Sequence, residues 1–233
     1  MNTPCIGILG GMGPLASAAF VNTIYQQWSG EIEQSAPRVL LHSDPSFPDR
    51  TTLLLDGRDD VLLERLDTAI GVLSDAGATR IVICCMTIHC LLPRLPPARR
   101  RPVVSLLDTA FELVRETPGR HVLLCATGSR QVRLFEQHAA WPEVADRLIM
   151  PTAEDQRAVH GLIYRLKRSD EDVTTIAAEF ERLVHAYGAS SFVAGCSELH
   201  LLTRCVSRAG AGAGQRCCGL DPLTRIAHRL VQN

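Results

Sequence analysis

The chain has 233 residues, with 24 lysines and arginines against 25 aspartates and glutamates, and 46% of its residues are hydrophobic. This near-neutral balance argues against a protein whose main partner is nucleic acid or an anionic membrane surface. The length suffices for one large domain or two small domains with their own cores. No apolar stretch approaches the roughly 20 residues of a membrane span, and the N-terminus lacks the positive charge of a secretory signal. We therefore expect a cytoplasmic protein.

The cysteine and lysine contents agree with this expectation. Nine cysteines are an odd number that cannot pair fully, and a chain of this length needs no disulfide scaffold. We expect reduced thiols. Lys167 is the only lysine, so nearly all cationic side chains are arginines.

Short apolar runs alternate with longer segments of helical period, a pattern typical of strand and helix units around a parallel sheet. The predicted strands are residues 6–9, 39–42, 81–84, 103–106, 121–125 and 191–194. The predicted helices are residues 14–28, 61–76, 108–116, 129–138, 152–167, 170–186 and 222–230. Loops are expected at residues 43–50 and 96–102.

These elements predict an α/β fold of two similar lobes. We expect the first lobe to comprise residues 1–101 plus 211–233, and the second to comprise residues 102–210. Gly77 is expected to end one helix and Asp170 to cap the start of another. The Gly-Ala stretch at residues 210–214 is expected to be a flexible link.

Two of the predicted strands end in the same way. The strand at residues 81–84 runs into Cys85 and Thr87, and the strand at residues 191–194 runs into Cys196 and Ser197. In open α/β sheets ligands bind at the carboxyl ends of strands, where helix N-termini favour a thiolate. If the lobes face each other, the two cysteines lie across one cleft. The alternative is that both are small buried hydrophobic residues, but their matched positions favour a functional pair.

Such a pair suits the inversion of a carbon centre by proton transfer. One base must remove a proton from one side of the substrate, and an acid must return a proton from the other side. The reference pKa of a cysteine, about 8.5, lets thiolate and thiol coexist near neutral pH.

The sequence resembles the aspartate/glutamate racemase superfamily, and within it the cofactor-independent aspartate racemases, over nearly its whole length. The resemblance is carried by six motifs in order: GILGGMGPLA at residues 7–16, PDRT at 48–51, CMTIH at 85–89, TG at 127–128, GCSEL at 195–199 and DP at 221–222. The glycine-rich loop alone is a weak signal, but the ordered set is specific. Lys167 falls where the aspartate branch carries a lysine.

The resemblance implies two pseudo-symmetric Rossmann-like lobes, an active site in the cleft between them, and a homodimer. It implies no pyridoxal phosphate or other cofactor and no metal. Cys85 and Cys196 become the catalytic residues for opposite faces of an acidic amino acid, aspartate before glutamate. The implied substrate-binding residues are Met12, Gly13, Arg50, Met86, Thr87, Thr127, Lys167, Ser197 and Glu198.

The resemblance also implies which part of the substrate each of these residues contacts. Thr87 and Ser197 are expected to hold the α-carboxylate and to stabilise the charge that develops as the α-proton leaves. Arg50 and Lys167 are expected to bind a side-chain carboxylate, arginine by its planar fork and lysine as a point charge.

One position departs from the family pattern. Met86 stands where the family has an asparagine that helps to hold the polar part of the substrate, and a thioether cannot donate a hydrogen bond. Either another donor compensates, or the substrate lacks the group that the asparagine would meet. An isomerase or epimerase of a modified or non-amino carboxylic acid, with the same cysteine pair, therefore stays open. So does a catalytically silent, bilobed binding protein.

Other chemistries have weaker support. Cys84, Cys85, His89 and Cys90 lie close together, but they contain no CxxC pair and span a strand end, which argues against zinc. The glycines at residues 10–13 lack the GxGxxG spacing of a dinucleotide site. His89 is interpreted as a residue of the helix start rather than as a base.

Overall fold

The computed structural model describes residues 5–168, 171–208 and 217–232. The strands are β1 (Cys5–Gly10), β2 (Arg38–Ser43), β3 (Arg80–Ile83), β4 (Val103–Val104), β5 (His121–Cys125), β6 (Leu148–Ile149), β7 (Ser191–Gly195) and β8 (Cys218–Leu220). The α-helices are α1 (Pro14–Gln27), α2 (Arg50–Leu55), α3 (Asp59–Asp75), α4 (Pro97–Arg100), α5 (Leu106–Glu116), α6 (Thr127–Gln131), α7 (Trp141–Val144), α8 (Ala153–Leu166), α9 (Val173–Ala186), α10 (Leu199–Arg208) and α11 (Pro222–Gln232). The short 3-10 helices are η1 (Glu33–Ser35), η2 (Thr87–Arg94) and η3 (Ala145–Arg147).

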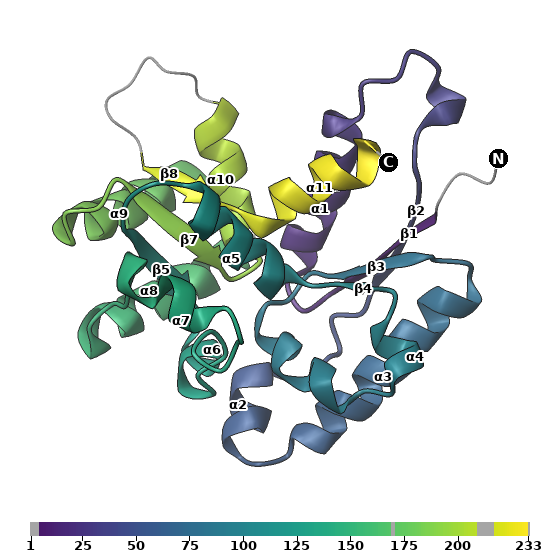
Figure 1. Ribbon diagram of the computed structural model, residues 1–233, viewed down its shortest axis with the longest axis horizontal. Coiled ribbons are helices and arrows are strands. Elements are labelled where there is room, and N and C mark those ends of the chain that lie inside the picture. The colour runs from purple at the N-terminus through teal and green to yellow at the C-terminus, as the bar shows by residue number, and fades with distance from the viewer. Residues whose placement is uncertain (1–4, 169–170, 209–216, 233) are drawn as a thin grey trace.

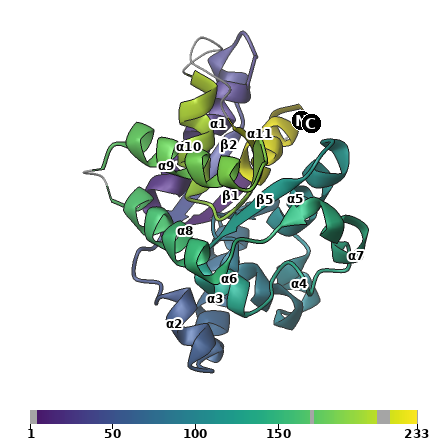
Figure 2. The same ribbon diagram turned by 90° about the vertical axis from the view of Figure 1, so that its left-hand side faces the viewer.

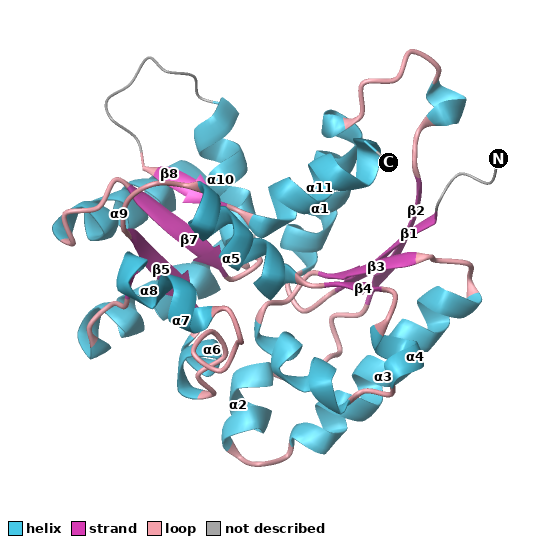
Figure 3. Cartoon of the chain, viewed as in Figure 1, coloured by secondary structure: helices cyan, strands magenta, loops and turns pink. Residues whose placement is uncertain are grey.

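The strands form two separate parallel sheets (Figure 3). The first has the order β2-β1-β3-β4 and the second the order β6-β5-β7-β8, with every neighbouring pair parallel. The central strands β1, β5 and β7 are buried along their whole length, which is why they appear as continuous apolar runs in the sequence. The equal strand order confirms the predicted α/β fold of two pseudo-symmetric lobes.

Three hydrophobic clusters hold the sheets and helices together. On one face of the first sheet lie α3 and η2, and on one face of the second lie α8, α9 and α10. Figure 2 shows α8 and α9 in front of the second sheet. The third cluster is shared by both lobes, because residues of α1, α5 and α11 pack there against strands of both sheets (Figure 1). This shared core sets the two lobes against each other.

The strands cross the division that we expected between the lobes. β4 pairs with β3 in the first sheet although it begins beyond residue 102, and β8 pairs with β7 in the second sheet although it follows residue 211. Each of these strands leads into a helix of the shared core, α5 and α11 respectively. The chain therefore completes one sheet before it passes to the other lobe.

Several predicted elements differ from the structure for local reasons. The strand expected at residues 103–106 ends at Val104, because the hydroxyl of Ser105 accepts a hydrogen bond from the Asp108 N–H at 3.0 Å and caps α5. The helix expected at residues 129–138 is the shorter α6, and Arg133 beyond it has a positive φ of 52°. The helices α2, α4, α7 and α10 and the strands β6 and β8 were not predicted. Asp170 and residues 210–214 lie outside the described residues.

No helix in the described part of the chain is long and apolar enough to cross a membrane.

Candidate functional site

The two cysteines that follow the third strand of each sheet line one small cavity. Cys85 lies just beyond β3 and Cys196 just beyond β7, and their side chains are 6% and 7% exposed. The residues that line the cavity are Met12, Asp49, Arg50, Thr51, Cys85, Thr87, Ala126, Tyr164, Lys167, Cys196 and Glu198. Both lobes therefore contribute to its wall, at the carboxyl ends of the central strands.

Seven of the sequence-predicted site residues lie in this wall: Met12, Arg50, Cys85, Thr87, Lys167, Cys196 and Glu198. Four others, Gly13, Met86, Thr127 and Ser197, do not line it. The wall also contains four residues that were not predicted, Asp49, Thr51, Ala126 and Tyr164. Asp49 and Thr51 belong to the PDRT motif, so the motif itself was the signal for them. Nothing local in the sequence distinguishes Tyr164 from other helix residues.

Arg50 is held rigidly at the start of α2. The side chain of Asp49 caps this helix by accepting from the Thr52 N–H at 2.8 Å. The Arg50 guanidinium donates from Nη2 to the Met12 carbonyl at 2.7 Å and from Nη1 to the Pro48 carbonyl at 3.0 Å. Burial opposes its charge, but attraction to Cys85, Asp49 and Glu198 outweighs this and raises the pKa of Arg50. A fixed positive charge therefore stands beside the Cys85 sulfur.

Cys196 has the opposite surroundings. Its thiol donates a hydrogen bond from Sγ to Oε2 of Glu198 at 2.8 Å. Burial, followed by the negative charge of Glu198 and this hydrogen bond, raises the pKa of Cys196 well above its ordinary value, against an opposing effect of Lys167. Cys196 is therefore held as a thiol, whereas Cys85 faces a cation.

Lys167 caps the C-terminus of α8 and reaches the cavity beside Tyr164. Its Nζ lies 4.1 Å from the centre of the Tyr164 ring and 4.0 Å from Oε1 of Glu198. The Tyr164 hydroxyl donates to Oδ2 of Asp49 at 2.8 Å. Burial and this bond raise the pKa of Tyr164 to about 12. Because Asp49 precedes α2 and Tyr164 lies in α8, the hydrogen bond joins the two lobes next to the cavity.

The two hydroxyls expected to bind the α-carboxylate have different positions. Thr87 lines the cavity, with Oγ1 at 2.8 Å from Oγ of Ser129. Ser197 instead donates to the Cys84 carbonyl at 3.0 Å and lies 3.2 Å from Oε2 of Glu198. The Ser197 hydroxyl thus joins the ends of β3 and β7 across the two lobes, and its contact with substrate stays a prediction.

Three further residues predicted to bind substrate do not line the cavity. Met86 is 2% exposed and packs in the shared core rather than facing the cavity. A thioether is apolar enough to be buried there, so this departure from the family pattern does not leave a missing donor in the wall. Gly13 lies behind the wall, against the carboxyl group of Glu198. Thr127 begins α6, and its N–H donates to Nδ1 of His160 at 3.3 Å.

His89 supports the loop that carries Cys85. Its Nδ1 donates to the Cys85 carbonyl at 2.9 Å, and its Nε2 accepts from the Leu106 N–H at 3.3 Å. Burial lowers the pKa of His89 to about 4, so the ring is neutral at pH 7. One side chain therefore fixes both the backbone of Cys85 and the start of α5, as the interpretation of His89 as a helix-start residue predicted.

The stability of the protein is expected to fall by about 2 kcal/mol between pH 7 and pH 5 through His89 alone. The unfolded chain binds a proton at this histidine near pH 6.5 and the folded protein only near pH 4, so protonation in this range favours unfolding. Urea unfolding at the two pH values measures the loss. His89→Gln has no titrating group and should lack this component. An unchanged pH dependence in the variant would contradict the assignment of a buried neutral ring.

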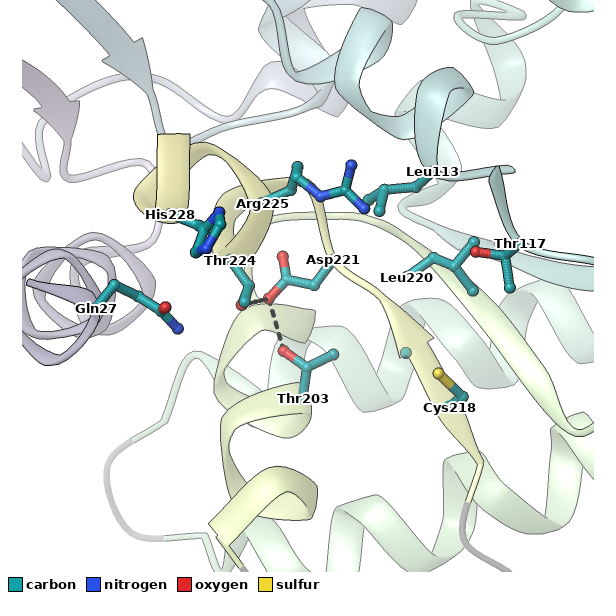
Figure 4. A pocket seen from close by; sticks show the side chains of 11 residues that line it. Gln27, Leu113, Thr117, Thr203, Cys218, Leu220, Asp221, Thr224, Arg225 and His228 are labelled. Carbon is teal, nitrogen blue, oxygen red and sulfur yellow. Dashed lines mark hydrogen bonds between the residues drawn. The ribbon is translucent and has the colours of Figure 1, made fainter. Parts of the chain in front are cut away.

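A second hollow lies where β8 meets α10 and α11 (Figure 4). Among the described residues it shares no lining residue with the cavity of the cysteines. Asp221, from the DP motif, lies in its wall, and its Oδ2 accepts from the hydroxyls of Thr203 and Thr224, both at 2.7 Å. The same oxygen accepts from Nδ1 of the buried His200 at 2.6 Å. The DP motif therefore connects α10 to α11 by hydrogen bonds, and Asp221 does not line the cavity of the cysteines.

Comparison with known proteins agrees with the fold. The chain is similar to the solved structure of Picrophilus torridus aspartate racemase, at 18% identity and a TM-score of 0.79 over 98% of this chain and 93% of that one. It is similar to allantoin racemase from Klebsiella pneumoniae, at 13% identity and a TM-score of 0.62 over 98% and 88%. It is also similar to glutamate racemase from Campylobacter jejuni, at 13% identity and a TM-score of 0.59 over 98% and 85%.

At these identities the structural likeness shows the fold alone. The family assignment comes from a family model, Asp/Glu/Hydantoin racemase, which matches residues 9–211. This match covers most of the chain and includes both cysteines of the cavity. The chain therefore belongs to the Asp/Glu/Hydantoin racemase family.

Proposed function

We propose that this protein is a cofactor-independent racemase that inverts the α-carbon of an acidic amino acid, aspartate first and glutamate next. The observation that carries the proposal is the placement of Cys85 and Cys196, from opposite lobes, in the wall of one cavity with Arg50 and Lys167. Two thiols supply an acid and a base, and two cations select negative charge on the substrate.

The surroundings of the two sulfurs support different starting roles. We assign the removal of the α-proton to Cys85, next to the Arg50 guanidinium: its sulfur takes this proton and becomes a thiol. Cys196, whose proton is directed at Glu198, gives that proton to the opposite face of the α-carbon and becomes the thiolate. For the other enantiomer the transfer runs in reverse. Proton exchange with water restores the starting state after the product leaves.

The remaining groups of the wall bind the two carboxylates. Thr87 lines the cavity, and we assign its hydroxyl to the α-carboxylate, where negative charge develops as the proton leaves. Arg50 and Lys167 receive the side-chain carboxylate. Ser197 contributes indirectly, because it joins the two strand ends that carry the cysteines. The homodimer expected from the sequence stays a prediction.

The direct test is proton NMR of the purified protein with L- and D-aspartate and L- and D-glutamate in D₂O under reducing conditions, with chiral chromatography in parallel. We expect the α-proton signal of aspartate to disappear as the other enantiomer forms, without added pyridoxal phosphate. A folded sample that exchanges none of the four amino acids would overturn the proposed substrate.

Replacement of Arg50 by alanine should weaken the binding of aspartate by about 100-fold, because a buried cation for its side-chain carboxylate is lost. Binding of alanine, which has no such carboxylate, should change far less. Isothermal titration calorimetry measures both ligands. Arg94→Ala removes an exposed arginine that is paired with Asp59 and serves as the matched control. Equal losses for aspartate and alanine would remove Arg50 from the carboxylate site.

A further inference from the structure

Glu198, which lines the cavity, has one buried hydrogen-bond acceptor that no described residue uses. Its side chain is buried, and Oε2 accepts from the Cys196 thiol and lies within reach of the Ser197 hydroxyl. Oε1 is buried and has no hydrogen-bond partner among the described residues. The Nζ of Lys167, at 4.0 Å, lies beyond hydrogen-bond distance from it. Buried carboxylate oxygens are normally hydrogen-bonded, so this atom points to a donor that a ligand supplies.

Gly13 explains how this carboxyl group is accommodated. A β-carbon at Gly13 would overlap Oε1 of Glu198, although the extended backbone there, with a φ of −177°, is open to any residue. A side chain at Gly13 would therefore displace the carboxyl group of Glu198, whereas the backbone conformation at Gly13 does not call for glycine. The missing side chain lets the carboxyl group lie against the glycine-rich turn, where Oε2 accepts from the Cys196 thiol and Oε1 has no hydrogen-bond donor among the described residues.

The other carboxylate in the wall is fully used. Asp49 accepts from the N–H of Thr52 at 2.8 Å and from its hydroxyl at 3.1 Å, and from the Tyr164 hydroxyl at 2.8 Å. Both carboxylate oxygens of Asp49 therefore already accept hydrogen bonds, and neither is left for a ligand. A ligand that carries carboxylates alone would bring negative charge next to the buried Glu198, which is unfavourable in a site of low dielectric. A ligand with an ammonium group would instead give Oε1 a charged donor.

We infer that Oε1 of Glu198 binds the α-ammonium group of the substrate, so that the site selects amino dicarboxylic acids over dicarboxylic acids without an amino group. This inference rests on the proposed function and specifies the substrate class. It also assigns one carboxyl group two contacts, the Cys196 thiol on Oε2 and the substrate nitrogen on Oε1. The substrate nitrogen is bonded to the α-carbon. By binding both this nitrogen and the Cys196 thiol, Glu198 therefore places the α-carbon next to the Cys196 sulfur, which protonates it.

The test compares ligand pairs that differ only in the amino group, aspartate with succinate and glutamate with glutarate. Isothermal titration calorimetry on the wild type should show the amino member of a pair binding at least about tenfold more tightly. Glu198→Gln should weaken aspartate and strengthen succinate, which brings the ratio close to one. A wild type without preference in either pair, or a variant that retains the preference, would overturn the inference.

Two further variants separate this role from others. Cys196→Ala should abolish racemisation but keep the preference for the amino ligand, because Oε1 is untouched. A preference that disappears in Cys196→Ala would mean that Glu198 acts only on the Cys196 thiol.

Gly13→Ala displaces the Glu198 carboxyl group without changing its charge and should also lower the preference for the amino ligand. It therefore tests the inference even if Glu198→Gln does not fold. A wild type that prefers amino ligands but neither exchanges nor racemises them would refute the proposed function alone.

Discussion

Replacement of Cys85 by alanine is expected to reduce the racemisation of aspartate by about 10³-fold in both directions, because each direction uses both sulfurs. At pH 7 the variant should also exchange the α-proton of aspartate only very slowly, and only in the enantiomer whose α-proton faces Cys196. The remaining thiol, Cys196, is held mainly in its protonated form by burial and by Glu198, so only a small fraction of it can act as a base at this pH. NMR in D₂O and chiral chromatography measure exchange and racemisation separately.

The partner variant, Cys196→Ala, should behave differently. It should lose racemisation to the same extent but still exchange the α-proton of one enantiomer, because Cys85 beside Arg50 can remove a proton and return a deuteron on the same face. Cys218→Ala removes an exposed thiol of β8 and should retain full activity. Equal exchange in the two active-site variants would contradict the unequal starting states of the sulfurs, and racemisation by either would exclude the two-thiol mechanism.

Replacement of Asp221 by alanine should lower the free energy of unfolding at pH 7 by about 3–5 kcal/mol, because it leaves His200 buried without its partner. His200 is 0% exposed and its Nδ1 donates to Asp221 at 2.6 Å. The hydroxyls of Thr203 and Thr224 lose the same acceptor (Figure 4). Urea unfolding measures the change, and Thr224→Val, which removes one of these bonds, should cost only about 1 kcal/mol.

The hydrogen bonds of Asp221 contribute to the free energy of unfolding only within a defined pH range. Burial alone would raise the pKa of Asp221, but His200 and the two threonine hydroxyls outweigh burial and lower it to about 2. The contribution is therefore complete above the unfolded pKa of about 3.9 and is lost as the pH falls towards 2. Asp221→Ala should lack this acid-sensitive component. A loss as small as that of Thr224→Val would mean that the network does not hold α10 to α11.

Much of the site was predictable because its residues belong to local motifs. Cys85 and Cys196 follow apolar runs of strand length, and such runs report burial in a parallel sheet without any knowledge of their partners. The equal order of the strands in the two sheets then follows from repetition of the same unit. Arg50 and Lys167 could be placed in the site from the resemblance alone, and both line the cavity.

Contacts between the lobes could not be predicted. The bond between Tyr164 and Asp49 joins positions 115 residues apart, and the bond between Ser197 and Cys84 joins positions 113 residues apart. Neither leaves a periodic signal along the chain. For the same reason β8 and α2 were missed, because a three-residue strand and a six-residue helix owe their stability to packing and capping rather than to their own pattern.

By itself, therefore, the sequence determined the class of fold, the two sulfurs and the cations that accompany them, since these depend on local burial patterns and on short motifs. Only the tertiary structure decided how each side chain is used. It buried Met86 in the shared core and turned the Ser197 hydroxyl towards the Cys84 carbonyl. Within the described part of the chain, it left one oxygen of Glu198 without a hydrogen-bond partner. The physical reason is that the direction of a side chain at a strand end depends on what packs against it from the other lobe.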